Sequence, residues 1–439
     1  MKKIRLFFII LFSSVTFANA VPSDDYLLGY FSSKAKPLIT TSSLNEMIEL
    51  MGDRQLVMLG ESSHGSAEFY AKRLEITKRL IREKKFNFIV VEGDWASIAR
   101  LNQYVKNTSN SLSSAREVLH TFNRWPEWMW KNSYIENLAE WLRKYNFNLP
   151  DHEKVGIYGM DVYEQQDAID GLLVFIDQYF PHYYTQVNQN LKCFTRRYRQ
   201  YWEQNIARGD FSCQQGLTAV ANLLHYLVAT NNTFKEFDFF QAEQNALIVK
   251  NAESFYRLSD LDKNTDSWNS RAGHMWLSIK RLLALHGDQS KGIIWAHNTH
   301  VGDARATPMY SSGLNNIGHL SRAEFGERRV FILGFGTNQG KVSAAHSWGE
   351  PMQVMTVPIG VDGSYEQILS QISKPSFYLL FNNKDRANLL LNQYRQHRAI
   401  GVVYDPDHEK SKHYVPSILP RRYDGFIFIN NTTELKELD

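Results

Sequence analysis

Residues 55–65 read QLVMLGESSHG, and this stretch decides which fold the chain adopts. Its first five residues form an apolar run that is typical of a strand buried on both faces, and glycine and polar residues then end the run. Similar runs occur at residues 88–91, 155–158, 292–295, 330–333, 377–381, 400–404 and 425–429. Between the first two runs, apolar residues recur at helical spacing from residue 69 to residue 81. Continuous apolar strands separated by amphipathic helices predict an α/β fold with a mostly parallel central sheet flanked by helices.

The chain from residue 164 to about residue 284 differs from this pattern. It shows no strand-like run, and apolar residues recur there at helical spacing among aromatic and charged ones. Pro, Gly and Ser do not cluster enough to mark a linker. With 439 residues, 43% of them hydrophobic, the chain can bury a large core. We therefore expect one domain, residues 21–439, with a helical cap inserted at about 164–284.

The first 20 residues have the layout of a secretory signal peptide. Lys2, Lys3 and Arg5 precede an apolar run at residues 6–12, and Ala-Asn-Ala at residues 18–20 provides a cleavage site. The apolar run is too short for a membrane anchor, and no later segment is apolar enough to span a bilayer. We expect cleavage after residue 20 and a periplasmic or secreted protein.

The composition limits the classes of partner. The chain has 49 basic and 46 acidic residues, a net charge of +3, so we expect neither nucleic acid nor an anionic membrane as partner. The two cysteines, Cys193 and Cys213, are more often bridged than free in an oxidising compartment, although two buried thiols are the alternative. They make a poor zinc site because no closely spaced histidines lie near them in the sequence to complete the ligand set.

Four of the predicted strands are followed by ionisable side chains at their carboxyl ends. These side chains are Glu61, His64, Glu92, Asp161, His297 and His300. In an α/β sheet, ligand crevices form at this edge, so the side chains are expected to converge. Capping of the next helix explains Asp161 equally well when it is taken alone.

His64 is the first candidate for catalysis. It is expected near the start of the following helix, where the positive end of the helix dipole disfavours an imidazolium, and a neutral imidazole can accept a proton from water. Glu61 and Glu92 could orient the ring or hold the water, but two acids would also raise its pKa. The sequence leaves open which effect dominates.

His297 and His300 are spaced three residues apart and would share one face of a helical turn. In that position they could stabilise an oxyanion or protonate a leaving alkoxide. Taken alone, the pair is explained equally well by hydrogen-bonded packing. Arg73 could bind an anionic group or pair with Glu92, and a structural ion pair is the commoner fate of such a residue.

At these residues the chain resembles the erythromycin esterase family, over roughly the whole expected mature chain. The matching segments are residues 60–65 (GESSHG) with Arg73, 91–95 (VEGDW), 124–130 (RWPEWMW), 158–161 (YGMD) and 295–305 (WAHNTHVGDAR). Residues 302–307 and 400–404 look like a broad bacterial subgroup rather than the antibiotic-resistance enzymes.

The resemblance implies a metal-independent hydrolase, without a cofactor, built as an α/β core with a helical cap around a deep cleft. It implies that His64 is the general base, that Glu61 and Glu92 assist it, and that His297, His300 and Arg73 belong to the active site. We further expect Trp95, Asp161, Asn298 and Arg271 to bind the substrate, a small ester or lactone such as a macrolide.

Three other functions remain open from the sequence. A serine hydrolase would use Ser62, Ser63 or Ser66, but no G-x-S-x-G motif occurs. A metal-dependent hydrolase could gather the same histidines and glutamates around one cation. A periplasmic binding protein could hold a polar ligand in the same cleft, with tryptophans of the 95–130 region stacking on sugar rings, although core packing better explains most of them.

Overall fold

The computed structural model describes residues 23–108, 113–194, 212–230, 235–261 and 263–439. The expected signal peptide at residues 1–20 lies outside these ranges, and the side chains of Cys193 and Cys213 also lie outside what is described. Export and the pairing of the two cysteines therefore stay predictions.

The strands of the described chain form one nine-stranded sheet in the order β1-β8-β9-β6-β2-β5-β3-β4, with β7 pairing β6 outside this path. Every pair from β9 to β4 is parallel, whereas β1, β7 and β8 pair antiparallel. The predicted α/β fold with a mostly parallel sheet is thus confirmed. The strands are β1 (Lys36–Pro37), β2 (Leu56–Leu59), β3 (Phe88–Asp94), β4 (Gly156–Asp161), β5 (Gly292–Trp295), β6 (Val330–Ala344), β7 (Gln353–Val357), β8 (Ser376–Leu380) and β9 (Gly425–Thr432).

Helices cover both faces of the sheet, which explains why its central strands are continuously apolar. In β2, Leu56 and Met58 pack in one buried cluster, while Val57 and Leu59 pack in another on the opposite face. The first cluster includes helices α1 (Asp24–Lys34), α12 (Asn264–His286), α15 (Ile317–Phe325) and α16 (Tyr365–Ser370). The second includes α2 (Asn45–Gly52), α3 (Ala67–Lys84), α5 (Ala115–His120), α6 (Ser133–Asn146) and most of α4 (Trp95–Val105).

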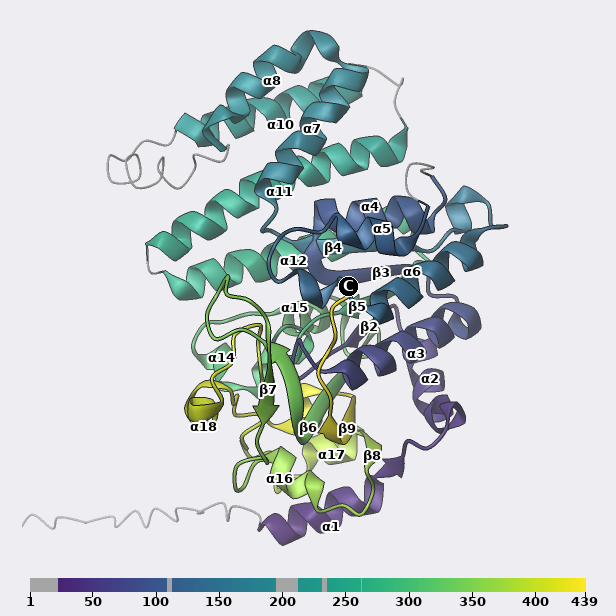
Figure 1. Ribbon diagram of the computed structural model, residues 1–439, viewed down its shortest axis with the longest axis vertical. Coiled ribbons are helices and arrows are strands. Elements are labelled where there is room, and N and C mark those ends of the chain that lie inside the picture. Colours follow the sequence, from purple (N-terminus) through teal and green to yellow (C-terminus); the bar gives the residue numbers. More distant parts are fainter. Residues whose placement is uncertain (1–22, 109–112, 195–211, 231–234, 262) are drawn as a thin grey trace, which may run out of the picture.

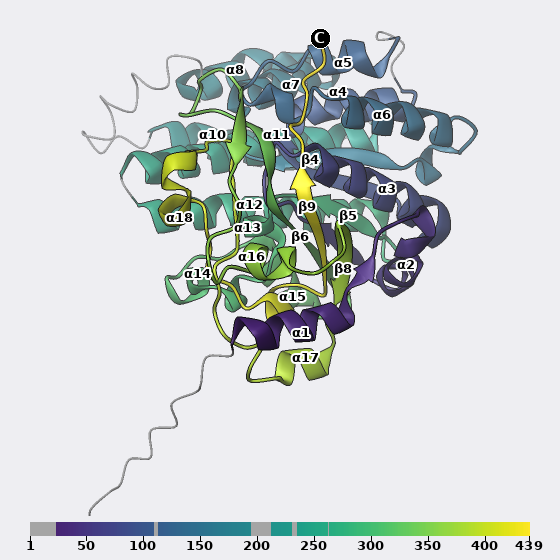
Figure 2. The same cartoon turned by 60° about the horizontal axis from the view of Figure 1, so that its bottom comes forward.

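A stack of helices follows β4 and lies beyond that edge of the sheet (Figures 1 and 2). It consists of α7 (Gln165–Tyr179), α8 (Tyr184–Leu191), α10 (Ser212–Thr230) and α11 (Glu236–Asp260), and α12 returns the chain to β5. The described part of the expected insertion is therefore helical. Short helices complete the C-terminal half: α13 (Asn298–Val301), α14 (Pro308–Ser311), α17 (Asn383–Ala387), α18 (Glu409–Lys412) and α19 (Leu419–Arg422).

The apolar run at residues 400–404, predicted as a strand, is not one. It makes only single bridges, Ile400 with Ser63 in the turn after β2 and Val403 with Ala345 just past the end of β6, so it has no continuous strand partner. Conversely, β7 was not predicted, since only Met355 and Val357 of its residues are buried and the run is mostly polar or exposed. The strand β6 continues well past the predicted residues 330–333 to Ala344 and forms a hairpin with β7.

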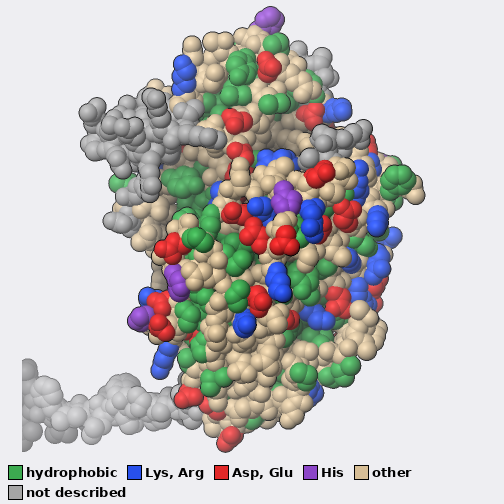
Figure 3. Space-filling view, viewed as in Figure 1, with side chains coloured by type: hydrophobic (Ala, Val, Ile, Leu, Met, Phe, Trp, Pro, Cys, Tyr) green, Lys and Arg blue, Asp and Glu red, His purple; other side chains and the backbone are tan. Residues whose placement is uncertain are grey.

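None of the helices in the described ranges combines the length and the apolar character that crossing a membrane requires. On the face drawn in Figure 3, acidic and basic side chains are interspersed, in keeping with the nearly balanced composition of 49 basic and 46 acidic residues.

Candidate active site

Backbone hydrogen bonds to four other segments fix the turn that follows β2. Its amide and carbonyl groups bond to Leu333 and Ser343 of β6, to Asn298 after β5, to Ile400 and to Leu435, with N···O distances between 2.8 and 3.0 Å. A turn held from so many sides keeps its side chains in one geometry, as a catalytic site requires.

Two glycines of this turn are required by close backbone approach. A Cβ at Gly65 would lie 1.9 Å from the carbonyl oxygen of Ser343, and a Cβ at Gly60 would lie 2.2 Å from Oδ1 of Asn298. Only glycine permits these contacts, which seat the turn against β6 and the loop after β5.

His64 is oriented by a carboxylate that is itself held by an arginine. Its Nδ1 lies 2.9 Å from Oε1 of Glu61, and the other oxygen of Glu61 pairs with Nη2 of Arg73 at 2.5 Å. Arg73 is 1% exposed, and its guanidinium lies over the rings of Tyr70 and Trp295. Arg73 is therefore a buried support for Glu61.

His297 presents an unused nitrogen beside His64. The two ring centroids are 4.9 Å apart. The backbone N–H of Thr299 donates to Nδ1 of His297 at 3.2 Å, and its hydroxyl lies 2.8 Å from the same atom. These bonds make Nδ1 an acceptor and place the proton of the neutral ring on Nε2, which is buried and has no hydrogen-bond partner among the described residues.

Glu92 joins the two downstream histidines. Its Oε2 accepts the backbone N–H of His297 at 2.9 Å, and its Oε1 lies 3.2 Å from Nε2 of His300. Arg271 also donates from Nη2 to Oε1 of Glu92 at 2.9 Å. The carboxylate thus fixes the start of α13, where both histidines are carried.

Arg271 of α12 connects the cap to the sheet. Its Nε and Nη2 donate to the two oxygens of Asp161 at 2.8 and 2.6 Å, and its Nη1 lies 3.1 Å from Nε2 of His300. Arg271 and Asp161, both expected to bind substrate, are therefore brought into the cluster but are bonded mainly to each other. The strand-end side chains do converge at the carboxyl edge of the sheet.

The two neighbouring imidazoles have pKa values displaced in opposite directions. Burial lowers the pKa of His64, but its hydrogen bond to Glu61 and the charges of Glu61 and Glu92 outweigh burial and raise it above 6.5. Burial and the adjacent His64 hold the pKa of His297 well below 6.5. The sequence left open whether the helix dipole or the acids would dominate the pKa of His64. In the structure His64 lies two residues before Ser66, the N-cap of α3, and the acids raise its pKa.

Glu92 and Asp161 are kept ionised by their partners. Burial raises the pKa of Glu92, but His300, Arg271 and His64 outweigh burial and hold it well below its ordinary value. Burial likewise opposes ionisation of Asp161, and Arg271 overcomes it, so that the pKa of Asp161 is also lowered. The site is therefore a network of compensated charges.

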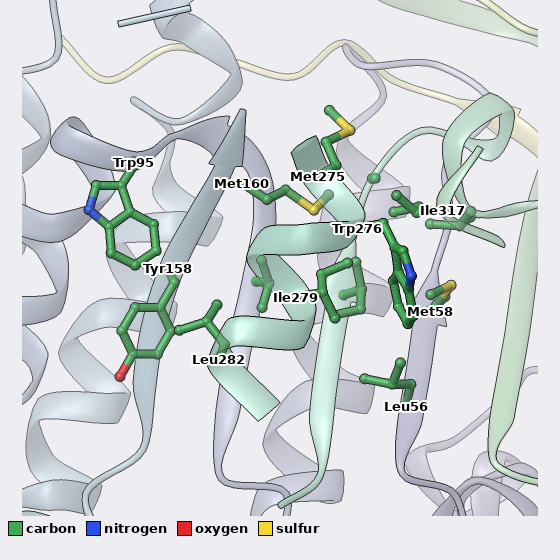
Figure 4. Close-up of a cluster of buried hydrophobic side chains, with 14 of the residues drawn as sticks. Leu56, Met58, Trp95, Tyr158, Met160, Met275, Trp276, Ile279, Leu282 and Ile317 are labelled. Atoms are coloured by element: carbon green, nitrogen blue, oxygen red, sulfur yellow. The ribbon is translucent and has the colours of Figure 1, made fainter. Parts of the chain in front are cut away.

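Asn298 and Trp95, both predicted to bind substrate, point into the protein interior instead. Asn298 is fully buried, donates from Nδ2 to the Phe335 carbonyl at 2.7 Å and accepts the Phe335 N–H at 3.3 Å, so it links α13 to β6. Trp95 is 3% exposed and stacks on Tyr158 within the buried cluster of Figure 4. Its ring faces the core because α4 begins at this residue, directly after the strand.

Trp268 is a site residue that the sequence did not single out. Its ring stacks on His300 with centroids 4.8 Å apart and an interplanar angle of 8°, and its Nε1 donates to the Asn315 carbonyl at 2.6 Å. It lies three residues before Arg271 on α12, so helical spacing from that arginine was the available signal.

The serines of the turn do not form a nucleophile–base pair in the described chain. Ser63 and Ser66 bond to each other, and the buried hydroxyl of Ser62 has no partner there. Within the described residues, no three His, Cys, Asp or Glu side chains are arranged to hold a metal ion.

Comparison with known proteins agrees with the resemblance noted from the motifs. Among solved structures, a Bacillus cereus protein superposes with a TM-score of 0.78 at 21% identity, covering 95% of this chain and 100% of that chain. A succinoglycan biosynthesis protein gives 0.76 at 18% identity, with 94% and 99% covered. A histidine-to-asparagine mutant of the erythromycin esterase EreC, in its open conformation, gives 0.68 at 16% identity, with 92% and 99% covered. These likenesses show a shared fold.

A family model described as erythromycin esterase matches residues 81–432, which is most of the chain. On that match, the chain belongs to the erythromycin esterase family.

Proposed function

We propose that this protein is an exported hydrolase that cleaves an ester or lactone by attack of water, with His64 as the general base. Membership of the erythromycin esterase family supports hydrolysis of an ester bond. The observation that carries the mechanism is the bonding of His64: Nδ1 is engaged by Glu61, while Nε2 makes no hydrogen bond to any described residue.

In this mechanism the Nδ1–H of His64 donates to Glu61, so that the lone pair of the neutral ring lies on Nε2. Nε2 takes a proton from water as the water oxygen attacks the carbonyl carbon of the substrate. The carboxylate of Glu61 then stabilises the imidazolium, and its ion pair with Arg73 keeps that carboxylate aligned.

His297 has the properties of an oxyanion donor. Its lowered pKa keeps the ring neutral, and its buried Nε2–H makes no hydrogen bond to a described side chain and lies near the backbone of Ser62. A preorganised donor of this kind stabilises the negative oxygen of the tetrahedral intermediate. When the intermediate collapses, the proton held by His64 passes to the leaving alkoxide, and the products are a carboxylic acid and an alcohol.

The names of two structural relatives point to two kinds of substrate. One structural relative is named as an erythromycin esterase and another as a succinoglycan biosynthesis protein, so macrolide lactones and ester-bearing saccharides are both candidates. The proposal therefore names an ester or lactone as the substrate class.

The test is hydrolysis of a panel of esters and lactones, including a macrolide, by the wild type and by His64→Ala. We expect the wild type to hydrolyse at least one compound and His64→Ala to lose about 10²- to 10⁴-fold in kcat, the usual contribution of a general base. His152→Ala is the matched control, because the side chain of His152 is 80% exposed and lies outside the cluster.

Two results would contradict this mechanism. Undiminished turnover in His64→Ala would remove the general base. Activity that disappears on chelation and returns with a divalent metal would favour the metal-dependent alternative.

The proposal of export rests on the charged, apolar and small-residue order of residues 1–20. Expression of the full chain in a Gram-negative host should yield a mature N-terminus at Val21. Retention of the full N-terminus in the cytoplasm would contradict export.

A further inference from the structure

Three aromatic rings meet where the loop after β6 reaches the start of the cap. Trp348, between β6 and β7, contacts Trp125 with ring centroids 4.6 Å apart and Tyr163 at 6.1 Å. The Nε1 of Trp125 donates to the carbonyl of Glu350 at 2.8 Å and so ties the two loops together. We call Trp125, Tyr163 and Trp348 the aromatic wall.

The aromatic wall adjoins the catalytic cluster. The guanidinium of Arg271 lies 5.0 Å from the centroid of Tyr163, and the same guanidinium is bonded to Glu92 and Asp161. The guanidinium of Arg124 also lies near this ring, 4.8 Å from the Tyr163 centroid. Arg124 pairs with Asp94, which ends β3 two residues after Glu92. Arg271 alone thus separates Tyr163 of the wall from Glu92, the carboxylate that bonds to His297 and His300.

The wall is open to a ligand. Trp348 is 61% exposed, which is unusual for the largest apolar side chain, and Trp125 is only partly buried. The partly exposed Arg124 lies against Tyr163, and the exposed His346 and Glu350 each lie two residues from Trp348 in the chain. An exposed aromatic face beside the catalytic groups is a binding feature rather than part of the core.

We propose that the aromatic wall binds a sugar ring, and that the substrate of this site is an O-acylated saccharide. This inference rests on the proposed function for its reacting group. A pyranose ring has an apolar C–H face that can lie on Trp348 and hydroxyls at its edge that can bond to the polar residues nearby. A plain aromatic ring could use the same face but has no hydroxyls to bond to these polar residues.

The experiment compares methyl 6-O-acetylglucopyranoside with ethyl acetate and benzyl acetate, each hydrolysed by the wild type, Trp348→Ala, Trp348→Phe and Phe147→Ala. Phe147 is the control because it is 73% exposed and lies after α6, outside the wall. We expect Trp348→Ala to raise KM for the sugar ester about tenfold more than for ethyl acetate, as expected for loss of one aromatic contact. Trp348→Phe should recover much of the loss, and Phe147→Ala should leave KM unchanged for all three esters.

Equal effects of Trp348→Ala on the sugar ester and ethyl acetate would overturn the proposal, and so would a selective loss for benzyl acetate but not for the sugar ester. A binding measurement separates this result from failure of the proposed function. Calorimetry with methyl 6-O-acetylglucopyranoside and the His64→Ala protein should show binding that a second change, Trp348→Ala, weakens. If the sugar ester binds and the wild type hydrolyses no ester, sugar binding by the aromatic wall is supported and the hydrolase proposal fails. If Trp348→Ala leaves binding unchanged, the wall itself is contradicted.

Discussion

His64 and His297 lie with their ring centroids 4.9 Å apart, and their surroundings displace their pKa values in opposite directions. Glu61 and Glu92 favour a proton on His64, whereas burial and His64 itself keep His297 neutral. Two titratable groups whose pKa values are pushed apart can take different roles in one reaction. Here the arrangement suits a base at His64 and a hydrogen-bond donor at His297.

Loss of the donor should reduce the rate more than the affinity. His297→Ala is expected to lower kcat about 10²- to 10³-fold with a small change in KM, because the Nε2–H acts on the oxyanion rather than on the bound substrate. His297→Gln, which can still donate, should recover part of the rate. Steady-state kinetics on the best ester of the panel provide the measurement, and a loss confined to KM would argue against an oxyanion role.

Arg73 should matter first for stability. Its guanidinium is 1% exposed and pairs with the buried carboxylate of Glu61, so Arg73→Met leaves that charge without its partner. We expect the free energy of unfolding to fall by about 3–5 kcal/mol in urea titrations.

The double variant Arg73→Met, Glu61→Gln is the control for this pair. It should be less destabilised than the sum of the two single changes, since it removes both charges. Additive effects would show that the ion pair is not the source of the loss.

Gly65 should not tolerate a side chain. The Cβ of Gly65→Ala would lie 1.9 Å from the Ser343 carbonyl oxygen, so the turn must move away from β6. We expect loss of at least about 1–3 kcal/mol of stability, together with a fall in kcat, because the turn carries Glu61 and His64. Gly29→Ala is the matched control, since nothing lies within 4 Å of its Cβ. Unfolding curves for the two proteins that coincide would contradict this account of the turn.

Arg271 should stabilise the fold in a pH-dependent way. The pKa values of Glu92 and Asp161 are lowered in the folded state, so their stabilisation is present above their ordinary values of 4.5 and 3.8 and is lost as the pH falls through the lowered values. Arg271→Met removes a partner of both acids. The difference in Tm from the wild type should therefore be largest near pH 7 and shrink below about pH 4. A difference that does not vary with pH would contradict the ionic role.

Sequence patterns predicted the sheet and the convergence of the site because both follow from local rules. Strand ends such as Leu59 and Trp295 could be read from apolar runs, and parallel pairing then brings the following side chains to one edge. The partners of those side chains depend on packing that no local rule provides. The position of Asn298 against Phe335 and the turning of Trp95 into the core needed the assembled structure.

The errors have the same physical origin. Ile400 and Tyr404 are apolar because they pack in a buried cluster with residues of β6 and β7, and an apolar run does not reveal whether it pairs as a strand or only packs beside one. Trp348 lies in a polar stretch without a motif, so only the fold brings it to Trp125 and Tyr163.

The most direct test of a general base at residue 64 is the pH dependence of kcat/KM for the wild type and for Glu61→Gln. In the wild type the rate should rise with pH through an apparent pKa above 6.5, because the imidazole must lose its proton before it can accept one from water. In Glu61→Gln the carboxylate that raises this pKa is gone, so the rise should move to lower pH while its plateau falls. An acidic limb that stays at the same pH in both proteins would show that the titrating group is not His64.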